Sequence, residues 1–300
     1  MTMDNANAAS ADSQRNPSAL LQRVLSAVVL LPLVVVCVWW SFWSFTLLVV
    51  AAAALGLSEL YAAFSRGGYQ SQTAPGMVAA AILIGVAIIR ALTALDLTAP
   101  ALALIVMVSL AMFAPRHAQH GVVAEWALTI SGAIYIGGLL GFLVLMRALE
   151  TPLRAGLLAP LQPQPGAAWI ALVLMTTWGQ DVFAYFVGKR WGRRRMAPSL
   201  SPRKTWEGAA GGMVGALAGA FLALALFGLP LSLGATTLIG IAAGIVGPIG
   251  DLSESFIKRQ AGLKDAGTLI PGHGGVLDRI DSLLFTAPTV YMLALLLVSG

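Results

Sequence analysis

The chain has 300 residues, of which 58% are hydrophobic and only 10% are charged. A water-soluble domain carries about 25% charged residues, so the composition excludes a soluble globular protein and makes lipid the expected solvent for most of the chain. The net charge of +5 does not indicate a nucleic-acid partner, because 11 of the 18 Lys and Arg residues lie in two short segments, 189–204 and 258–279, rather than in a separate basic domain.

The N-terminal residues 1–22 are polar and predict a disordered tail. The apolar run that follows, 24–40, has no small-residue cleavage site. It therefore predicts an uncleaved first helix rather than a signal peptide.

Nine apolar runs are long enough to cross a membrane as helices, which takes about 20 residues each. The runs are continuous rather than alternating, so they do not fit a β-barrel. We therefore expect an all-α polytopic membrane protein of about nine transmembrane helices, with N-terminal helices in 23–164 and a catalytic region in 165–300. The runs are 24–40, 45–64, 75–95, 98–114, 126–147, 167–188, 208–228, 231–250 and 283–299.

One segment qualifies this count, and another bears on packing. The proline-rich stretch 147–166 fits a span least well and suggests a re-entrant or interfacial piece, which leaves eight or ten spans open. Small residues in 208–219 predict a helix that approaches its neighbours closely.

The basic residues predict the orientation. With the N-terminus in the cytoplasm, 15 of the 18 Lys and Arg residues fall on the inner side, as the positive-inside rule requires. The polar loops 189–206 and 251–282 then share the cytoplasmic face.

Five of the 13 acidic residues lie between Asp251 and Asp281, which is a dense cluster for a chain with so few charges. Asp278 and Asp281 are three residues apart and share a face on a helix. Their oxygens suit Mg²⁺, which can hold phosphate oxygens. Asp251 follows an apolar run and could complete the site, although Asp251 with Glu254 also has the spacing of a helix N-terminal capping box.

A glycine-rich turn precedes Asp278, and its backbone N–H groups could point at an anion. It lacks the Gly-Lys-Ser/Thr sequence of a P-loop, and a tight turn is the structural alternative. The candidate residues are Gly272, His273, Gly274 and Gly275.

A second polar cluster lies before the run 208–228 and could bind phosphate through its cations and hydroxyls. The same residues also fit the start of a helix, with a proline and an acidic residue in the first turn, and both interpretations can hold together. The candidates are Ser201, Arg203, Lys204, Thr205 and Glu207.

Asp181 lies inside the sixth run, and a carboxylate within a span is a functional candidate. It could pair with an arginine of 193–195 or reach a nucleotide, and the sequence does not separate these roles. Glu59 and Arg90 have the same ambiguity.

The segment 255–282 reads SFIKRQAGLKDAGTLIPGHGGVLDRIDS and resembles the signature of phosphatidate cytidylyltransferases, which make CDP-diacylglycerol. The segments 181–188, 201–212 and 250–254 are also similar to that family. The resemblance covers about 165–300, whereas the first half matches only as a series of spans.

The resemblance implies a homodimeric enzyme of the inner membrane that uses Mg²⁺, with K⁺ as a candidate second cation. It implies that Asp251, Asp278 and Asp281 hold the metal and that the polar cluster around Lys204 meets phosphate. In the implied reaction, a phosphatidate oxygen attacks the α-phosphorus of CTP, and pyrophosphate leaves. Cations of the signature would neutralise the phosphates, although Lys264 could instead pair with Asp265. These cations are Lys258, Arg259, Lys264 and Arg279.

Of three alternatives, one is excluded and two remain at this point. The aspartate pattern of CDP-alcohol phosphotransferases fails here, because Asp281 is followed by Ser-Leu-Leu. A CTP-dependent polyprenol kinase would transfer the γ-phosphate instead. A transporter would place its charges near the midplane of repeated halves, and we find no repeat.

Overall fold

The computed structural model describes residues 17–263, 267 and 274–298, with side chains from residue 28 onward. The predicted site residues Lys264, Gly272 and His273 lie outside these described residues. The helices are α2 (Pro17–Trp40), α3 (Phe42–Arg66), α4 (Thr73–Thr93), α5 (Thr98–Phe113), α6 (Val122–Ala133), α7 (Leu139–Arg147), α8 (Pro165–Trp191), α9 (Trp206–Phe227), α10 (Leu233–Gln260) and α11 (Leu277–Val298).

Eight of the helices in the described part of the chain are long and apolar enough to cross a membrane. One of them, Val122–Arg147, combines α6, a π-helical turn at Ile134–Gly138 and α7. The described apolar part of α2, Val28–Trp40, is shorter. The prediction of an all-α polytopic membrane protein is therefore confirmed.

The structure corrects several predicted boundaries. Helix α2 begins at Pro17, so residues 17–22 are helical instead of belonging to a disordered tail. Helix α10 continues ten residues beyond the predicted run, and α11 begins six residues before its run. The loop after α8 contains an antiparallel hairpin of β1 (Arg195–Ala197) and β2 (Ser201–Thr205).

The proline-rich stretch after α7 contains no span. It includes a short 3₁₀ turn at Ala159–Leu161 and runs along the end of α9. The N–H groups of Leu157 and Leu158 donate to the carbonyls of Ala225 and Leu226 over 2.9 and 2.8 Å. These bonds satisfy carbonyls that the end of a helix leaves open.

Helices α8 and α9 form the closest pair in the bundle, and glycines make this contact. A Cβ on Gly215 would overlap the carbonyl of Gly179, and one on Gly219 would overlap that of Met175. The predicted close approach of the small-residue segment is confirmed. It also explains why α9 carries little side-chain bulk on this face.

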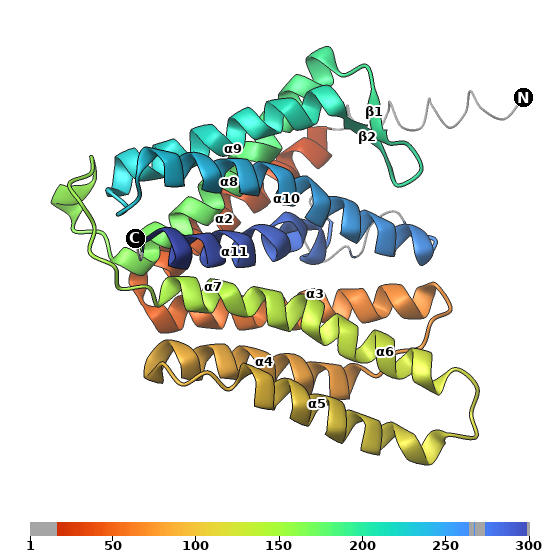
Figure 1. Ribbon diagram of the computed structural model, residues 1–300. Coiled ribbons are helices and arrows are strands. Elements are labelled where there is room, and N and C mark those ends of the chain that lie inside the picture. The colour runs from red at the N-terminus through yellow and green to blue at the C-terminus, as the bar shows by residue number, and fades with distance from the viewer. Residues whose placement is uncertain (1–16, 264–266, 268–273, 299–300) are drawn as a thin grey trace, which may run out of the picture.

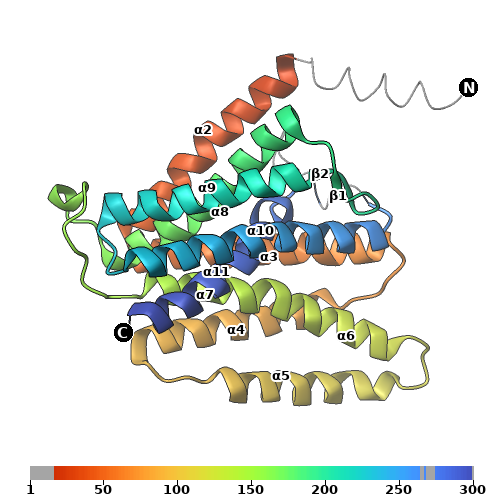
Figure 2. The same cartoon turned by 45° about the horizontal axis from the view of Figure 1, so that its top comes forward.

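Helix α11 lies in the middle of the bundle, between the α8–α10 group and helices α3 and α7 (Figure 1). Helices α4 and α5 lie at the outside of the same bundle, and α2 leaves it at an angle (Figure 2). The side chains of Leu284, Ala287 and Val290 are fully buried along α11. The helix that carries Asp278 and Asp281 is thus held by both halves of the chain.

Candidate active site

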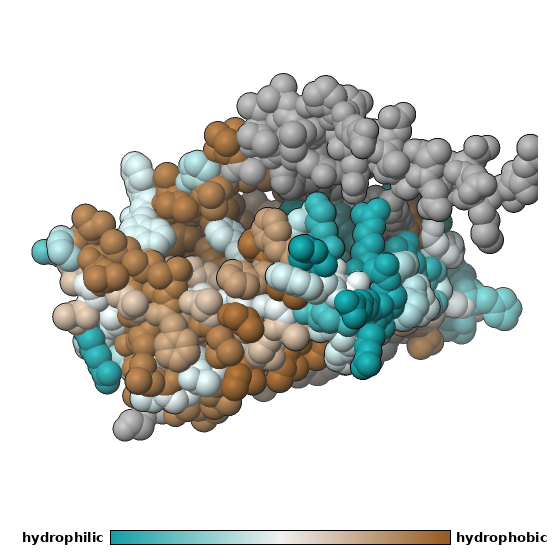
Figure 3. All heavy atoms as spheres, turned by 90° about the horizontal axis from the view of Figure 1, so that it is seen from above, coloured by the Kyte–Doolittle hydropathy of each residue, from teal (hydrophilic) through white to brown (hydrophobic). Residues whose placement is uncertain are grey.

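Hydrophilic side chains gather at the end of the molecule that carries the hairpin, whereas most of the rest of the same face is apolar (Figure 3). The hairpin is built locally. Thr205 is the N-cap of α9 and accepts from the Gly208 N–H over 3.1 Å, and Glu207 accepts from the Arg193 and Arg194 N–H groups. These bonds fix β2 against α9 and set the place from which Lys204 projects.

Helices α10 and α11 come together directly beside the acidic residues. A Cβ on Gly250 would lie 2.6 Å from the carbonyl oxygen of Asp281, so only glycine permits this approach. The next residue, Asp251, is consequently brought beside Asp281. Helix α10 runs unbroken through Asp251, so the capping-box interpretation of Asp251 and Glu254 is wrong.

Three carboxylates converge at this crossing. Asp251 and Glu254 lie one turn apart on α10, Asp281 lies on α11, and one oxygen of each falls within 4.8 Å of the others. The Glu254 side chain is 1% exposed, and its Oε1 has no hydrogen-bond partner among the described residues. Hard oxygen donors at this spacing can hold a divalent cation.

Two lysines face these carboxylates. Lys204 Nζ of the hairpin lies 2.6 Å from Asp251 Oδ2. Lys258 Nζ lies 2.5 Å from Glu254 Oε2 and 2.7 Å from Asp278 Oδ1. The lysines join β2, α10 and α11 into one charged network, and the two predicted polar loops do meet.

The structure groups the predicted aspartates differently from their spacing in sequence. Asp278 and Asp281 both lie in the first turns of α11, which extends into the predicted loop 251–282. Asp278, however, binds Lys258 through one oxygen and accepts from the Gly275 N–H over 2.9 Å through the other. Asp281 is the one that joins Asp251 and Glu254.

Asp181 of α8 lies near this network, within electrostatic range of Asp251, Lys204 and Arg279. Among the described residues, no ion pair joins it to the arginines of 193–195. The site therefore draws on four elements: α8, β2, α10 and α11.

The other predicted phosphate-binding residues either make structural contacts or are exposed. Arg259 donates to the carbonyls of Leu200 and Leu263 over 3.1 and 3.0 Å, which ties the hairpin to the end of α10. Ser201 pairs with Ala197 in the hairpin, and Arg203 and Arg279 are exposed. In the glycine turn, Gly274 has a φ of +86°, a conformation that favours glycine.

Two residues of the N-terminal half reach the site, and local sequence patterns did not identify their contacts. Tyr135, in the π-helical turn, interacts electrostatically with Glu254, Asp281 and Asp251, and its buried hydroxyl has no partner among the described residues. Glu59 of α3 accepts from the Leu277 N–H at the start of α11. A π-turn often marks a functional position, but it leaves no signature in a single sequence.

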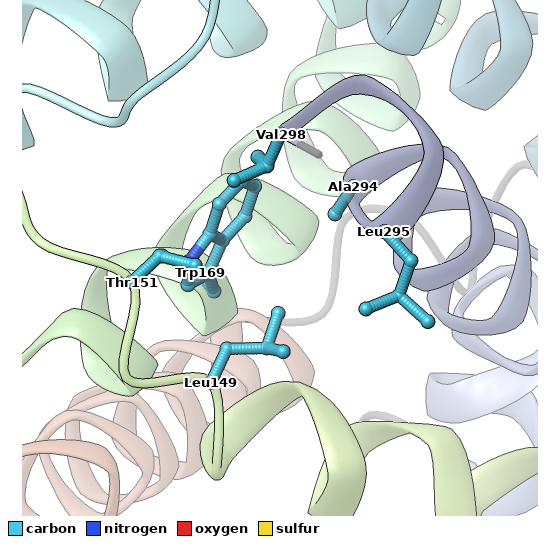
Figure 4. A pocket seen from close by; sticks show the side chains of 6 residues that line it. All are labelled: Leu149, Thr151, Trp169, Ala294, Leu295 and Val298. Atoms are coloured by element: carbon cyan, nitrogen blue, oxygen red, sulfur yellow. The ribbon is translucent and has the colours of Figure 1, made fainter. Parts of the chain in front are cut away.

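A pocket of about 220 Å³ lies at the other end of α11 (Figure 4). The indole N–H of Trp169 donates to the Thr151 hydroxyl over 2.7 Å, so these two polar side chains satisfy each other. From Asp281 to Ala294 the helix rises about 20 Å, which separates this pocket from the acidic network. Its lining residues are Leu149, Thr151, Trp169, Ala294, Leu295 and Val298.

Comparison with known proteins adds a family to this geometry. The sequence profile of the Cytidylyltransferase family matches residues 21–297. The chain is 32% identical over 291 residues to the phosphatidate cytidylyltransferase of Synechocystis sp., an alignment that covers 92% of this chain and 97% of the relative.

Two further relatives bear the same name and match over shorter stretches. The protein of Brucella abortus is 45% identical over 127 residues, covering 42% of this chain and 47% of the relative. The protein of Bacillus subtilis is 40% identical over 161 residues, covering 54% of this chain and 55% of the relative. These two matches thus span about half the length of each relative.

Proposed function

Because the chain belongs to the Cytidylyltransferase family, we propose that it transfers the cytidylyl group of CTP to phosphatidate, giving CDP-diacylglycerol and pyrophosphate. The observation that carries this proposal is the charged network of Asp251, Glu254, Asp281 and Lys204 at one end of an apolar helical bundle. Such an end can meet a water-soluble nucleotide and a lipid headgroup together. The names of the relatives supply the two substrates.

The donor set fits Mg²⁺. Asp251, Glu254 and Asp281 offer oxygens within 4.8 Å of one another, and the buried Oε1 of Glu254 lacks a hydrogen bond among the described residues. A bound Mg²⁺ would supply neutralisation of the phosphate oxygens. Asp278 then acts by holding Lys258 beside Glu254 rather than as a direct ligand. The second cation, such as K⁺, stays a prediction.

The protein residues position the two anionic substrates. Lys204 and Arg279 lie in the electrostatic range of Asp181 and can neutralise the triphosphate and the lipid phosphate. An oxygen of the phosphatidate phosphate attacks the α-phosphorus of CTP. A new P–O bond forms, the bond from the α-phosphorus to the bridging oxygen breaks, and that oxygen leaves with pyrophosphate. No covalent enzyme intermediate is required.

We place the site on the cytoplasmic face of the inner membrane and expect a homodimer. The orientation rests on the excess of Lys and Arg on one side of the predicted spans. Light scattering of the detergent-purified protein measures the oligomeric state, and a monomer would contradict the dimer without affecting the reaction.

Transfer of label tests the reaction. The full chain is purified in detergent and mixed with phosphatidate, Mg²⁺ and CTP labelled at the α-phosphate, and the organic phase is counted. We expect label in lipid together with released pyrophosphate, and neither in an EDTA sample. A folded protein that leaves all label in water would overturn the proposal.

The competing functions give different products in the same preparation. A polyprenol kinase would move label from γ-labelled CTP to a polyprenol and release CDP. A transporter would take up solute into liposomes without nucleotide.

A further inference from the structure

The start of α11 is held by a carboxylate from the opposite half of the chain. Glu59 Oε2 accepts from the Leu277 N–H over 2.8 Å, across 218 positions of sequence. Leu277 is the first residue of the helix, and its N–H has no partner within the helix. A negative charge at this end also interacts favourably with the helix dipole. Glu59 thus serves as a cap for the helix that carries Asp278 and Asp281.

Two glycines close around the same carboxylate. A Cβ on Gly275 would lie 2.5 Å from Glu59 Oε2 and 3.0 Å from Oε1. The three atoms nearest to a Cβ on Gly267 also belong to Glu59. Both glycines belong to the segment 255–282. The side chain of Glu59 therefore lies against this segment at two separate positions, Gly267 and Gly275.

The second oxygen of Glu59 faces the same segment. Oε1 is buried and has no hydrogen-bond partner among the described residues. A Cβ on Gly267 would overlap this oxygen. The carboxylate is therefore enclosed between the start of α11 and Gly267, and its place depends on the length of the side chain.

We propose that Glu59 is a positioning residue of the active site, which fixes the start of α11 and thereby the place of Asp281 opposite Asp251 and Glu254. The inference rests on the proposed cytidylyl transfer for its kinetic part, but not for its structural part. Short contacts connect Glu59 to the aspartates of α11. Glu59 packs against Gly275, whose N–H donates to Asp278. Asp281 lies about one turn further along the same helix.

Two substitutions separate the reach of the side chain from its charge. Glu59→Gln keeps the length and an acceptor oxygen for Leu277. Glu59→Asp keeps the charge but is one methylene too short to make the same bond. If the contact positions α11, the Asp variant should lose roughly 10-fold to 100-fold in kcat, as outer-shell partners of metal sites do, and the Gln variant should stay within about 3-fold of the wild type.

Glu125 offers a matched control in the same half of the chain. It is also buried, at 3% exposure, and pairs with Arg116 over 2.9 Å and with Gln72. No described contact joins it to α11. Glu125→Gln should lower thermal stability yet leave kcat of the folded protein within about 2-fold of the wild type.

Three measurements on each full-length variant test whether Glu59 positions α11. They are kcat and KM for CTP at saturating Mg²⁺, affinity for Mn²⁺ without substrates, and amide hydrogen exchange of the first turn of α11. In Glu59→Asp we expect faster exchange of that turn, weaker Mn²⁺ binding by a similar factor and the loss in kcat. Thermal melting confirms that each variant is folded.

Several results would overturn the inference. Unchanged hydrogen exchange in Glu59→Asp would show that Glu59 does not cap α11. Faster exchange with unchanged kcat and Mn²⁺ affinity would show that the contact is only a local structural one. If the wild type itself transfers no cytidylyl group, the proposed function fails. The exchange and Mn²⁺ data then judge the positioning role alone.

Discussion

The two ends of α11 serve different purposes although they belong to one helix. In its first turns, Asp278 and Asp281 belong to a dense cluster of charged side chains. The other members are Lys258, Asp251 and Glu254. In its last turns, Ala294 and Val298 line an apolar pocket whose two polar side chains bond each other.

The difference indicates which end of α11 stabilises the fold and which end serves the reaction. Burying charges costs free energy even when they are paired, and an apolar core would be at least as stable. The charged end is therefore the end that chemistry explains, while packing alone explains the apolar end. Four substitutions test this contrast, from the largest expected effect on activity to the smallest.

Asp281→Asn should lower cytidylyl transfer by roughly 100-fold or more, the scale on which lost electrostatic stabilisation acts on a transferring group. The amide keeps the shape but removes one charge from the carboxylate group. The label-transfer assay measures it, with thermal melting as the control for folding. Near-normal turnover at saturating Mg²⁺ would show that the charged end does not hold the metal.

Lys204→Ala should reduce transfer by about 10-fold to 100-fold, because Asp251 loses its partner and the site loses a cation. Lys204→Arg should restore part of the activity. Lys189→Ala removes a cation that lies over Tyr185 and serves as the control. Equal losses in both alanine variants would indicate a general effect of positive charge instead of a specific one.

We expect the Tyr135 hydroxyl to donate to a phosphate oxygen of the bound substrates. Tyr135→Phe should then reduce kcat by about 10-fold, the value of one hydrogen bond to a charged group. Only a hydroxyl is removed, and it has no partner among the described residues, so thermal stability should not fall. Parallel assays of kcat and melting temperature check this. A lower melting temperature with unchanged kcat would assign Tyr135 to the core.

Thr151→Val, at the apolar end, should leave transfer within about 2-fold and lower the free energy of unfolding by about 1 kcal/mol, since the Trp169 indole loses its acceptor. Melting and the transfer assay together measure both effects. A large loss of activity would connect the distal pocket to the chemistry and remove the contrast between the two ends.

Much of the fold follows from the sequence because spans depend on local composition. Composition does not predict the parts of helices that extend beyond the apolar runs. The segment 251–260 is charged, yet it continues α10, because a helix that has already formed adds residues at little cost. This difference explains why the sequence leaves a helix start at Asp251 open as an alternative and does not predict Glu254 as a member of the carboxylate group.

The site was predictable only in part, for a related reason. Asp251 and Asp281 were identified from their density and spacing, but which aspartate faces which partner depends on how two helices cross at Gly250. The contacts of Glu59 and Tyr135 join positions far apart in the chain, and no local pattern encodes them. The metal assignment itself stays a prediction.

The glycine contact between α8 and α9 has a consequence for mutational tolerance. At Gly215 the carbonyl of Gly179 occupies the space that a methyl group would need, and backbone cannot step aside as a side chain can. The smallest substitution, alanine, would therefore push apart the two helices that carry Asp181 and frame the hairpin with Lys204. In a survey of variants, this uncharged position should tolerate change as poorly as the residues that do the chemistry.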